Sequence, residues 1–136
     1  MDDVMDDAKP QGAAGQPPIA TALSTEEYAR AAADLAYDRL GTDIALLDIS
    51  KVSGFADYFV IITGETSRHL DGIANDLARG LREKGLRPHH REGSGSGGWI
   101  LLDYPGIVIH IFDRESRKRY GLERLWARAT EIVRLQ

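Results

Sequence analysis

The strongest constraint on the fold is an amphipathic helix pattern that lies between short apolar runs of the strand type. Apolar side chains recur three and four residues apart and predict one continuous stripe along a helix; they are Leu70, Ile73, Ala74, Leu77, Ala78 and Leu81. The apolar runs 43–49 and 58–63 precede this helix, and the runs 99–104 and 107–112 follow it. A helix with one apolar face must bury it against a second layer, so the pattern predicts an α/β layer fold.

The remaining segments extend this pattern to the order α–β–β–α–β–β–β–α. Ser24 and Glu27 have the spacing of a capping box, which predicts a first helix over 25–40. A weak strand pattern covers 87–92, and the Tyr-Pro-Gly turn at 104–106 joins the last two strands into a hairpin. The final apolar residues again follow a helical period and predict a last helix with an extension after Trp126; they are Leu122, Leu125, Trp126, Ala129, Ile132 and Val133. We therefore expect a single domain with a mixed five-stranded sheet flanked by helices.

Positions 1–22 differ in composition from the rest of the chain. They hold three of the five prolines and four aspartates, with few large apolar side chains and no periodicity. Such a composition is typical of a disordered tail, so the domain is expected to span 23–136. The chain has no cysteine and no run of about 18 apolar residues, and its acidic start lacks the apolar core of a secretory signal. We therefore expect a cytoplasmic protein that has no disulfide bond and does not enter a membrane.

The charge is distributed unevenly along the chain. The whole chain carries a net charge of −4, whereas the part from Arg114 to the end has seven Arg or Lys against three Glu. A domain that holds nucleic acid through its phosphates usually has a more basic total. The basic run is therefore interpreted as a solvated helix face, and no direct DNA binding is expected.

The segment 64–69, Gly-Glu-Thr-Ser-Arg-His, lies between a predicted strand and a predicted helix, where backbone amides often hold an anion. A Walker loop or a dinucleotide loop needs further glycines, and a Walker loop also needs a lysine. Thr66 or Ser67 is accounted for as the N-cap of the helix. The segment is therefore interpreted as a structural joint.

A nucleotidyl-transfer enzyme would need two or three clustered carboxylates to hold magnesium. Glu92 stands alone on its strand, and Asp103 has no acidic partner two positions away. His89 and His90 are neighbours and would point to opposite faces of a strand. His110 lies within a strand and is interpreted as a hydrogen-bonded sheet residue. The sequence therefore predicts no catalytic residues, no metal site and no cofactor.

Large aromatic side chains are the remaining candidates for a functional surface. Trp99 opens a strand, Tyr104 closes it, and Tyr120 and Trp126 lie in the final segment. Such residues anchor interfaces because they bury a large area at a small entropic cost. The alternative is that they cover the edge of the core. For Trp126, which shares a stripe with Leu122, the core is favoured; for Trp99 and Tyr104 both interpretations stay open.

Three segments of the chain together resemble the ribosomal silencing factor family, also called the Iojap family. They are DIALLDISKVSGFADYFVIITGETSRH, EGSGSGGWILLDYPGIVIHIF and RYGLERLW. The resemblance runs in order and with unbroken spacing from about Thr25 to Trp126. The acidic, proline-bearing segment before Ser24 and the ten residues after Trp126 depart from the family's common pattern.

The resemblance implies a protein without catalysis and with a nucleotidyltransferase-like fold. Members bind the large ribosomal subunit, chiefly through its fourteenth protein, and block joining of the small subunit, which lowers translation when nutrients are short. Relatives in organelles assist assembly of the large subunit, and members form homodimers. Trp99 and Tyr104 fall where the family places partner contacts, and we add Tyr120 and Leu122. Two alternatives remain: an assembly factor that uses the same surface, and a nucleotide-binding protein of the nucleotidyltransferase type.

Overall fold

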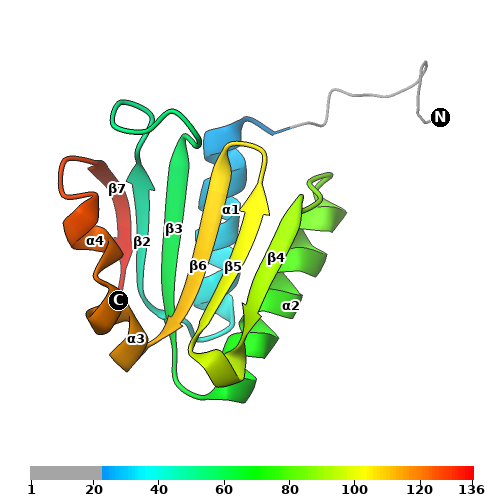
Figure 1. Ribbon diagram of the computed structural model, residues 1–136. Coiled ribbons are helices and arrows are strands. Elements are labelled where there is room, and N and C mark those ends of the chain that lie inside the picture. Colours follow the sequence, from blue (N-terminus) through cyan, green and yellow to red (C-terminus); the bar gives the residue numbers. More distant parts are fainter. Residues whose placement is uncertain (1–22) are drawn as a thin grey trace.

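The computed structural model describes residues 23–136, so the predicted tail at 1–22 lies outside the described residues. A mixed six-stranded sheet has two long helices packed on one face (Figure 1). The elements in chain order are α1 (Thr25–Asp38), β2 (Thr42–Asp48), β3 (Tyr58–Gly64), α2 (Ser67–Glu83), β4 (His90–Ser94), the short 3₁₀ helix η2 (Gly95–Gly97), β5 (Trp99–Tyr104), β6 (Ile107–Asp113), α3 (Arg114–Tyr120), α4 (Leu122–Leu125) and β7 (Thr130–Leu135). The mixed α/β architecture predicted from the sequence is confirmed, with one strand more than expected.

The first helix begins with the predicted capping box. The Ser24 hydroxyl accepts from the backbone N–H of Glu27 at 3.1 Å, and the Glu27 carboxylate accepts from the backbone N–H of Ser24 at 2.8 Å. The helix ends at Asp38, two residues before the predicted end, because Leu40 already adopts a left-handed conformation with φ +65°. Gly41 follows it, and a Cβ added there would lie 2.9 Å from Ile62. Glycine is therefore required at this position by close packing.

The strand order β4-β5-β6-β3-β2-β7 places the parallel pair β3 and β6 at the centre of the sheet, and every other neighbouring pair is antiparallel. The central strands are buried on both faces, which explains why their sequences lack alternation. In β5 burial alternates instead, because one face of this strand packs against the helices while the other is partly open. The side chains of β5 therefore divide between the two faces of the sheet.

The prediction of a final long helix is wrong. Two short helices, α3 and α4, are separated by Gly121, which adopts φ +58°, and the chain then pairs as β7 with β2 in an antiparallel arrangement. Ile132 and Val133 pack on the core between the sheet and the helices. Apolar β-branched residues suit a strand, and the otherwise unpaired edge of β2 supplies the hydrogen-bonding partner. The extension after Trp126 therefore adds the sixth strand.

The joint between β3 and α2 contains the predicted N-cap. The Thr66 hydroxyl accepts from the backbone N–H of His69 at 3.0 Å and caps the helix. The His69 ring also bridges two segments, because Nδ1 accepts from the backbone N–H of Glu65 at 3.0 Å and Nε2 lies 2.8 Å from the carbonyl oxygen of Arg39. An imidazole has one acceptor and one donor on opposite sides of the ring, which explains a histidine at this position.

Two hydrophobic clusters lie on the two faces of the sheet. The larger one joins α1 and α2 to the sheet. The smaller one lies on the face that these helices leave open, and its buried members are Ala45, Leu47, Ile49, Ala56, Phe59, Ile61, Val108 and Phe112. Within residues 23–136 no helix is long and apolar enough to cross a membrane. The open face of the sheet carries the candidate site.

Candidate partner-binding surface

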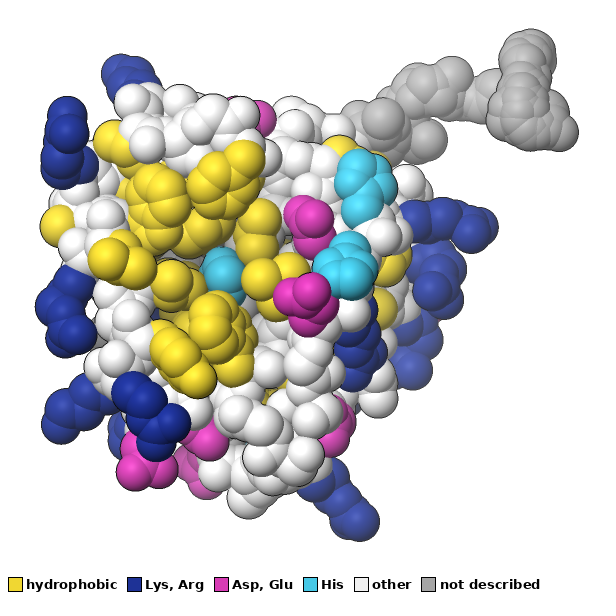
Figure 2. Space-filling view, in the orientation of Figure 1, with side chains coloured by type: hydrophobic (Ala, Val, Ile, Leu, Met, Phe, Trp, Pro, Cys, Tyr) yellow, Lys and Arg dark blue, Asp and Glu magenta, His cyan; other side chains and the backbone are white. Residues whose placement is uncertain are grey.

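Aromatic rings gather on the open face of the sheet, and we call this cluster the aromatic surface. Its members come from the β2–β3 loop, from β3, β5 and β6, from the end of α3 and from the segment after α4; they are Phe55, Phe59, Trp99, His110, Phe112, Tyr120 and Trp126. Figure 2 shows hydrophobic side chains gathered on this face, with acidic and histidine side chains along one side of the patch. Residues far apart in the sequence therefore form one continuous apolar region.

The rings form two groups that meet at one histidine. In the first group the centroid of Trp99 lies 4.6 Å from Tyr120 and 4.9 Å from Phe112. In the second group the centroid of Phe59 lies 5.4 Å from Trp126, which in turn contacts the ring in the β2–β3 loop at 5.9 Å. The His110 ring lies 4.7 Å from Phe59 and 5.9 Å from Trp99. Tilted and edge-to-face pairs at these distances stabilise the arrangement.

His110 orients the indole of Trp99. The Trp99 Nε1–H donates to His110 Nδ1 at 3.2 Å, so the imidazole is neutral and its proton resides on Nε2. The side chain is buried, and this burial lowers the pKa of His110 to about 4. Nε2 has no hydrogen-bond partner among residues 23–136. The prediction of a hydrogen-bonded sheet histidine is confirmed, and its hydrogen bond holds the indole of Trp99 in place.

Several members of this region are accessible to a partner. Phe55 is 66% exposed and Tyr120 is 45% exposed, while Trp99 and Trp126 are half-buried. A hollow of about 230 Å³ adjoins Trp99 and is bordered by the carboxylate-bearing Glu92. The surface thus combines exposed rings, a concave margin and an acidic border.

The structure brings together three of the four residues predicted to contact a partner. Trp99 and Tyr120 are in contact, and Leu122 packs half-buried against the same cluster. Tyr104 is separate, because it is only 2% exposed and belongs to the core under α1 and α2. Tyr104 lies five positions after Trp99 on the same strand, so the two side chains point to opposite faces. Tyr104 is therefore a core residue, which corrects the expected partner contact.

Sequence reasoning missed the contribution of two phenylalanines. Phe55 is a large aromatic residue in a polar loop, and this position was the sequence signal that could have identified it; the structure shows that it is exposed. Phe59 was assigned only to a buried strand, yet its ring links Phe55 with His110 across the surface. Their roles depend on the pairing of β3 with β6, which places the 59 and 110 side chains on one face.

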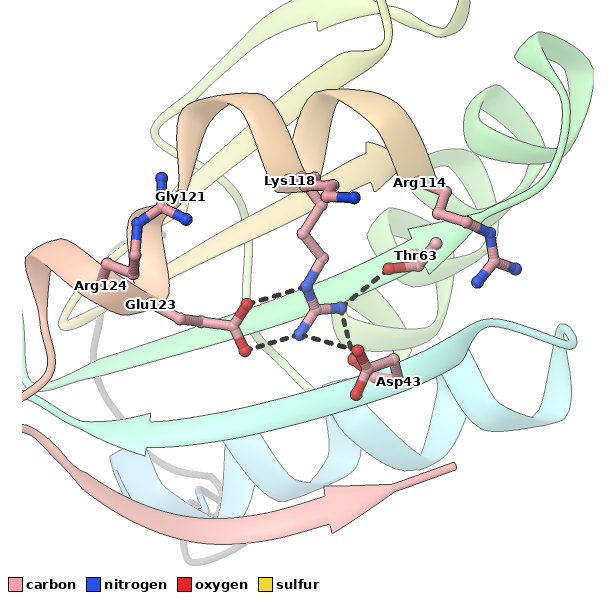
Figure 3. A pocket seen from close by; sticks show the side chains of 8 residues that line it. Asp43, Thr63, Arg114, Lys118, Gly121, Glu123 and Arg124 are labelled. Atoms are coloured by element: carbon pink, nitrogen blue, oxygen red, sulfur yellow. Dashed lines mark hydrogen bonds and ion pairs between the residues drawn. The ribbon is translucent and has the colours of Figure 1, made fainter.

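A second feature is a polar pocket of about 390 Å³ between α3, α4 and the ends of β2 and β3 (Figure 3). Its floor is Arg117, which is 8% exposed. The guanidinium donates to the Thr63 hydroxyl at 2.8 Å, to the two carboxylate oxygens of Glu123 at 3.0 and 2.8 Å, and to the backbone carbonyl of Asp43. The hydrogen bonds from Arg117 lower the pKa of Glu123. This network ties α3 and α4 to the sheet.

Within residues 23–136 no three His, Asp or Glu side chains come together in a way that could hold a metal ion. Glu92 instead lies 3.0 Å from His90 on the same edge strand. Chemically, the arrangement on the open face is suited to contact between surfaces.

The chain is similar over most of its length to proteins of one family. A family model described as "Ribosomal silencing factor during starvation" matches residues 22–136. The ribosomal silencing factor of Bacillus subtilis is 31% identical over 107 residues, which covers 79% of this chain and 91% of that protein. A mouse protein named "Mitochondrial assembly of ribosomal large subunit protein 1" is 32% identical over 87 residues, which covers 62% of this chain and 38% of that protein. A crystal structure of a Chromobacterium violaceum protein matches with a TM-score of 0.74 and 30% identity, over 77% of this chain and 88% of that one.

Proposed function

The chain belongs to the ribosomal silencing factor family, and from this membership we propose that it binds the large ribosomal subunit through the fourteenth large-subunit protein. The bound protein blocks joining of the small subunit and thereby lowers translation when nutrients are limited. The aromatic surface is the observation that carries this proposal, because it is the apolar, partly exposed face that a docking partner would cover.

The composition of the surface suits a protein partner. Trp and Tyr are enriched among the residues that dominate binding energy, and Trp99 and Tyr120 contact each other here in a tilted arrangement with their centroids 4.6 Å apart. Glu92 borders the hollow beside Trp99, and Asp103 lies on the same face of β5 as Trp99. Acidic groups around an apolar centre complement a basic protein and steer its approach. A ribosomal protein has this chemistry.

To block subunit joining by steric occlusion, the protein needs only to bind the joining face of the large subunit. A folded domain of this size has a radius of gyration of about 13 Å, and its placement on the joining face leaves no room for the small subunit there. No bond is made or broken in this mechanism, so we propose that the protein acts without catalysis and without a cofactor. We also propose that it acts in the cytoplasm, where ribosomal subunits join. In the free protein we propose a homodimer, because a second copy would cover exposed apolar side chains.

A second candidate function is assembly of the large subunit. The observation in its favour is the mouse relative, whose name refers to assembly of the mitochondrial large subunit. An assembly factor could use the same docking surface, so mutation of the surface would affect both functions equally. The two candidates differ in whether the bound protein prevents the joining of mature subunits.

Sedimentation with separated ribosomal subunits tests the proposal. The parent should comigrate with the large subunit and reduce the fraction of joined ribosomes at a magnesium concentration that supports joining. Trp99→Ala should weaken docking by roughly 2 kcal/mol or more, about 30-fold in Kd, as for a buried interface anchor. Tyr120→Ala removes a half-exposed ring at little structural cost and should weaken docking in the same direction. Tyr37→Ala is the matched control, because Tyr37 is a 54% exposed aromatic residue on α1, behind the sheet.

Each outcome of the sedimentation experiment has one interpretation. Comigration with loss of joining supports silencing, and comigration without loss of joining supports assembly. Failure of the parent to comigrate contradicts both. Equal binding by folded Trp99→Ala, Tyr120→Ala and Tyr37→Ala would show that the aromatic surface is not the docking site.

A further inference from the structure

The polar pocket under α3 and α4 has a cationic rim, formed by Arg114, Lys118 and Arg124. All three side chains are exposed. Among residues 23–136, no carboxylate lies within 4.0 Å of any of them, since every ion pair in this part of the chain involves other cations. Figure 3 shows Arg124 and Arg114 toward opposite ends of the pocket, with Lys118 between them. The rim therefore offers three positive charges in an extended row.

The charges at the floor of the pocket are already balanced. Arg117 lies 2.8 Å from Glu123, and Asp43 lies 2.7 Å from Arg134. The hydrogen bonds from Arg117 lower the pKa of Glu123, so this carboxylate stays ionised and stays paired. The rim charges are thus the uncompensated ones, and the pocket as a whole attracts an anion.

The lining of the pocket selects the kind of anion. Its residues are Asp43, Thr63, Arg114, Arg117, Lys118, Gly121, Glu123 and Arg124. Among these residues there is no aromatic or large apolar side chain on which a base could stack, whereas protein sites for nucleobases usually supply such a platform. Cationic side chains in a row fit successive phosphates of a polyanion better than a single nucleotide. The chemistry points to a phosphate backbone.

The rim and the aromatic surface are built on the same short helices. α3 contributes Lys118 to the rim and Tyr120 to the aromatic surface, and α4 contributes Leu122 to the aromatic cluster and Arg124 to the rim. A protein bound to the aromatic surface would therefore lie next to a ligand bound in the polar pocket. A ribosomal subunit consists of RNA as well as protein, so RNA phosphates are the anions that a pocket in this position would meet.

We propose that this pocket binds phosphates of the large-subunit RNA backbone, next to the ribosomal protein held by the aromatic surface. The inference rests on the proposed function, since it assigns the second component of the same binding partner. Recognition is by phosphate charge, so it contributes affinity and orientation and carries no base specificity. The basic run near the carboxyl end is thus more than a solvated helix face, because folding concentrates three of its charges at one pocket.

The test compares two triple variants with the parent. The rim variant combines Arg114→Ala, Lys118→Ala and Arg124→Ala. The control variant combines Arg79→Ala, Arg82→Ala and Lys84→Ala, which removes the same residue types from the end of α2, on the other face of the sheet. Binding is measured to purified large ribosomal subunits over a series of salt concentrations and, separately, to the isolated fourteenth large-subunit protein.

The rim variant should bind large subunits about tenfold or more weakly at 0.1 M salt. The slope of log Kd against log salt should fall by about 2 to 3, because each of the three lost phosphate contacts contributes about 0.7 for single strands and about 0.9 for a duplex. Its affinity for the isolated ribosomal protein should equal that of the parent. The control variant should match the parent in both assays.

Three results would overturn the inference. If the rim and control variants bind large subunits with equal affinity and equal salt slope, the pocket does not touch RNA, and the proposed function still stands. If the rim variant also loses affinity for the isolated ribosomal protein, the cations contact protein. If the parent itself binds neither the subunit nor the ribosomal protein, the proposed function fails, and this inference fails with it.

Discussion

Acidification from pH 7 toward pH 4 is expected to destabilise the protein through His110. The imidazole is held neutral in the fold because burial lowers its pKa to about 4, against 6.5 for a solvated side chain. Below pH 6.5 the unfolded chain therefore binds a proton that the folded chain excludes, so stability is fully present above that pH and falls as the pH decreases toward the folded pKa. The change is complete once the pH is below about 4.

The size of the effect follows from the two pKa values. Each pKa unit corresponds to 1.36 kcal/mol, so the difference amounts to at most about 3 kcal/mol in the free energy of unfolding, of which about 2 kcal/mol is lost by pH 5. Protonation has a local consequence as well. A protonated Nδ1 cannot accept the Trp99 Nε1–H, so the bond that orients the indole is lost together with stability.

Urea unfolding at pH 7, 6, 5 and 4.5 measures this effect in the parent and in His110→Phe. The variant loses the hydrogen bond to Trp99 at every pH, so its absolute stability is set aside and only the pH dependence is compared. The parent should lose about 2 kcal/mol more than His110→Phe between pH 7 and pH 5. His89→Asn removes an exposed histidine and is the matched control, which should retain the pH dependence of the parent. Parallel curves for the parent and His110→Phe would refute the reasoning, because they would mean that the folded protein accommodates the proton at no cost.

Two further substitutions test the packing on each side of the site. Arg117→Met leaves the half-buried Glu123 carboxylate with Arg134 as its remaining cation, 3.2 Å away, and leaves the buried Thr63 hydroxyl without its donor. It should lower the free energy of unfolding by about 1–3 kcal/mol. The exposed neighbour Arg119→Met should stay within about 0.5 kcal/mol of the parent, and equal values from denaturant titration would show that the network does not hold α3 to the sheet. Gly95→Ala would place its Cβ 1.9 Å from the Ser67 carbonyl oxygen and should cost about 1–3 kcal/mol, while Gly97→Ala meets no atom closer than 3.9 Å. A thermal melt of the two glycine variants should separate them, and identical melting temperatures would mean that η2 is not packed against α2.

The sequence alone determined those elements whose signals are local. The capping box at Ser24 and Glu27 marked the start of α1, and the apolar stripe marked α2 along its whole length. The Tyr-Pro-Gly turn joined β5 to β6, and Gly106 indeed adopts φ +78° there, the conformation that favours glycine at this point of a turn. Each of these patterns depends only on residues that are close in the sequence, so it can be recognised without knowledge of the fold.

The end of the chain shows where local signals are insufficient. Ile132 and Val133 fit a helical period counted from Leu122, and the same residues fit a strand. The choice depends on β2, whose outer edge accepts β7 along its length. That edge becomes available only after the sheet has formed, so the signal is not present in the final segment itself.

The candidate site likewise has features that the sequence predicts and features that only the tertiary structure decides. Side chains alternate between the two faces of a strand, so the sequence alone places Trp99 and Tyr104 on opposite faces of β5. Only tertiary packing decides which of these faces is covered by α1 and α2. The aromatic surface joins Phe55 to Trp126, and the buried network joins Asp43 to Arg117. Such contacts bridge long stretches of chain and exist because strand pairing brings distant segments to one face. The sequence therefore determined which aromatic and basic residues are present, and the order of the strands decided that they assemble into an aromatic surface beside a polar pocket.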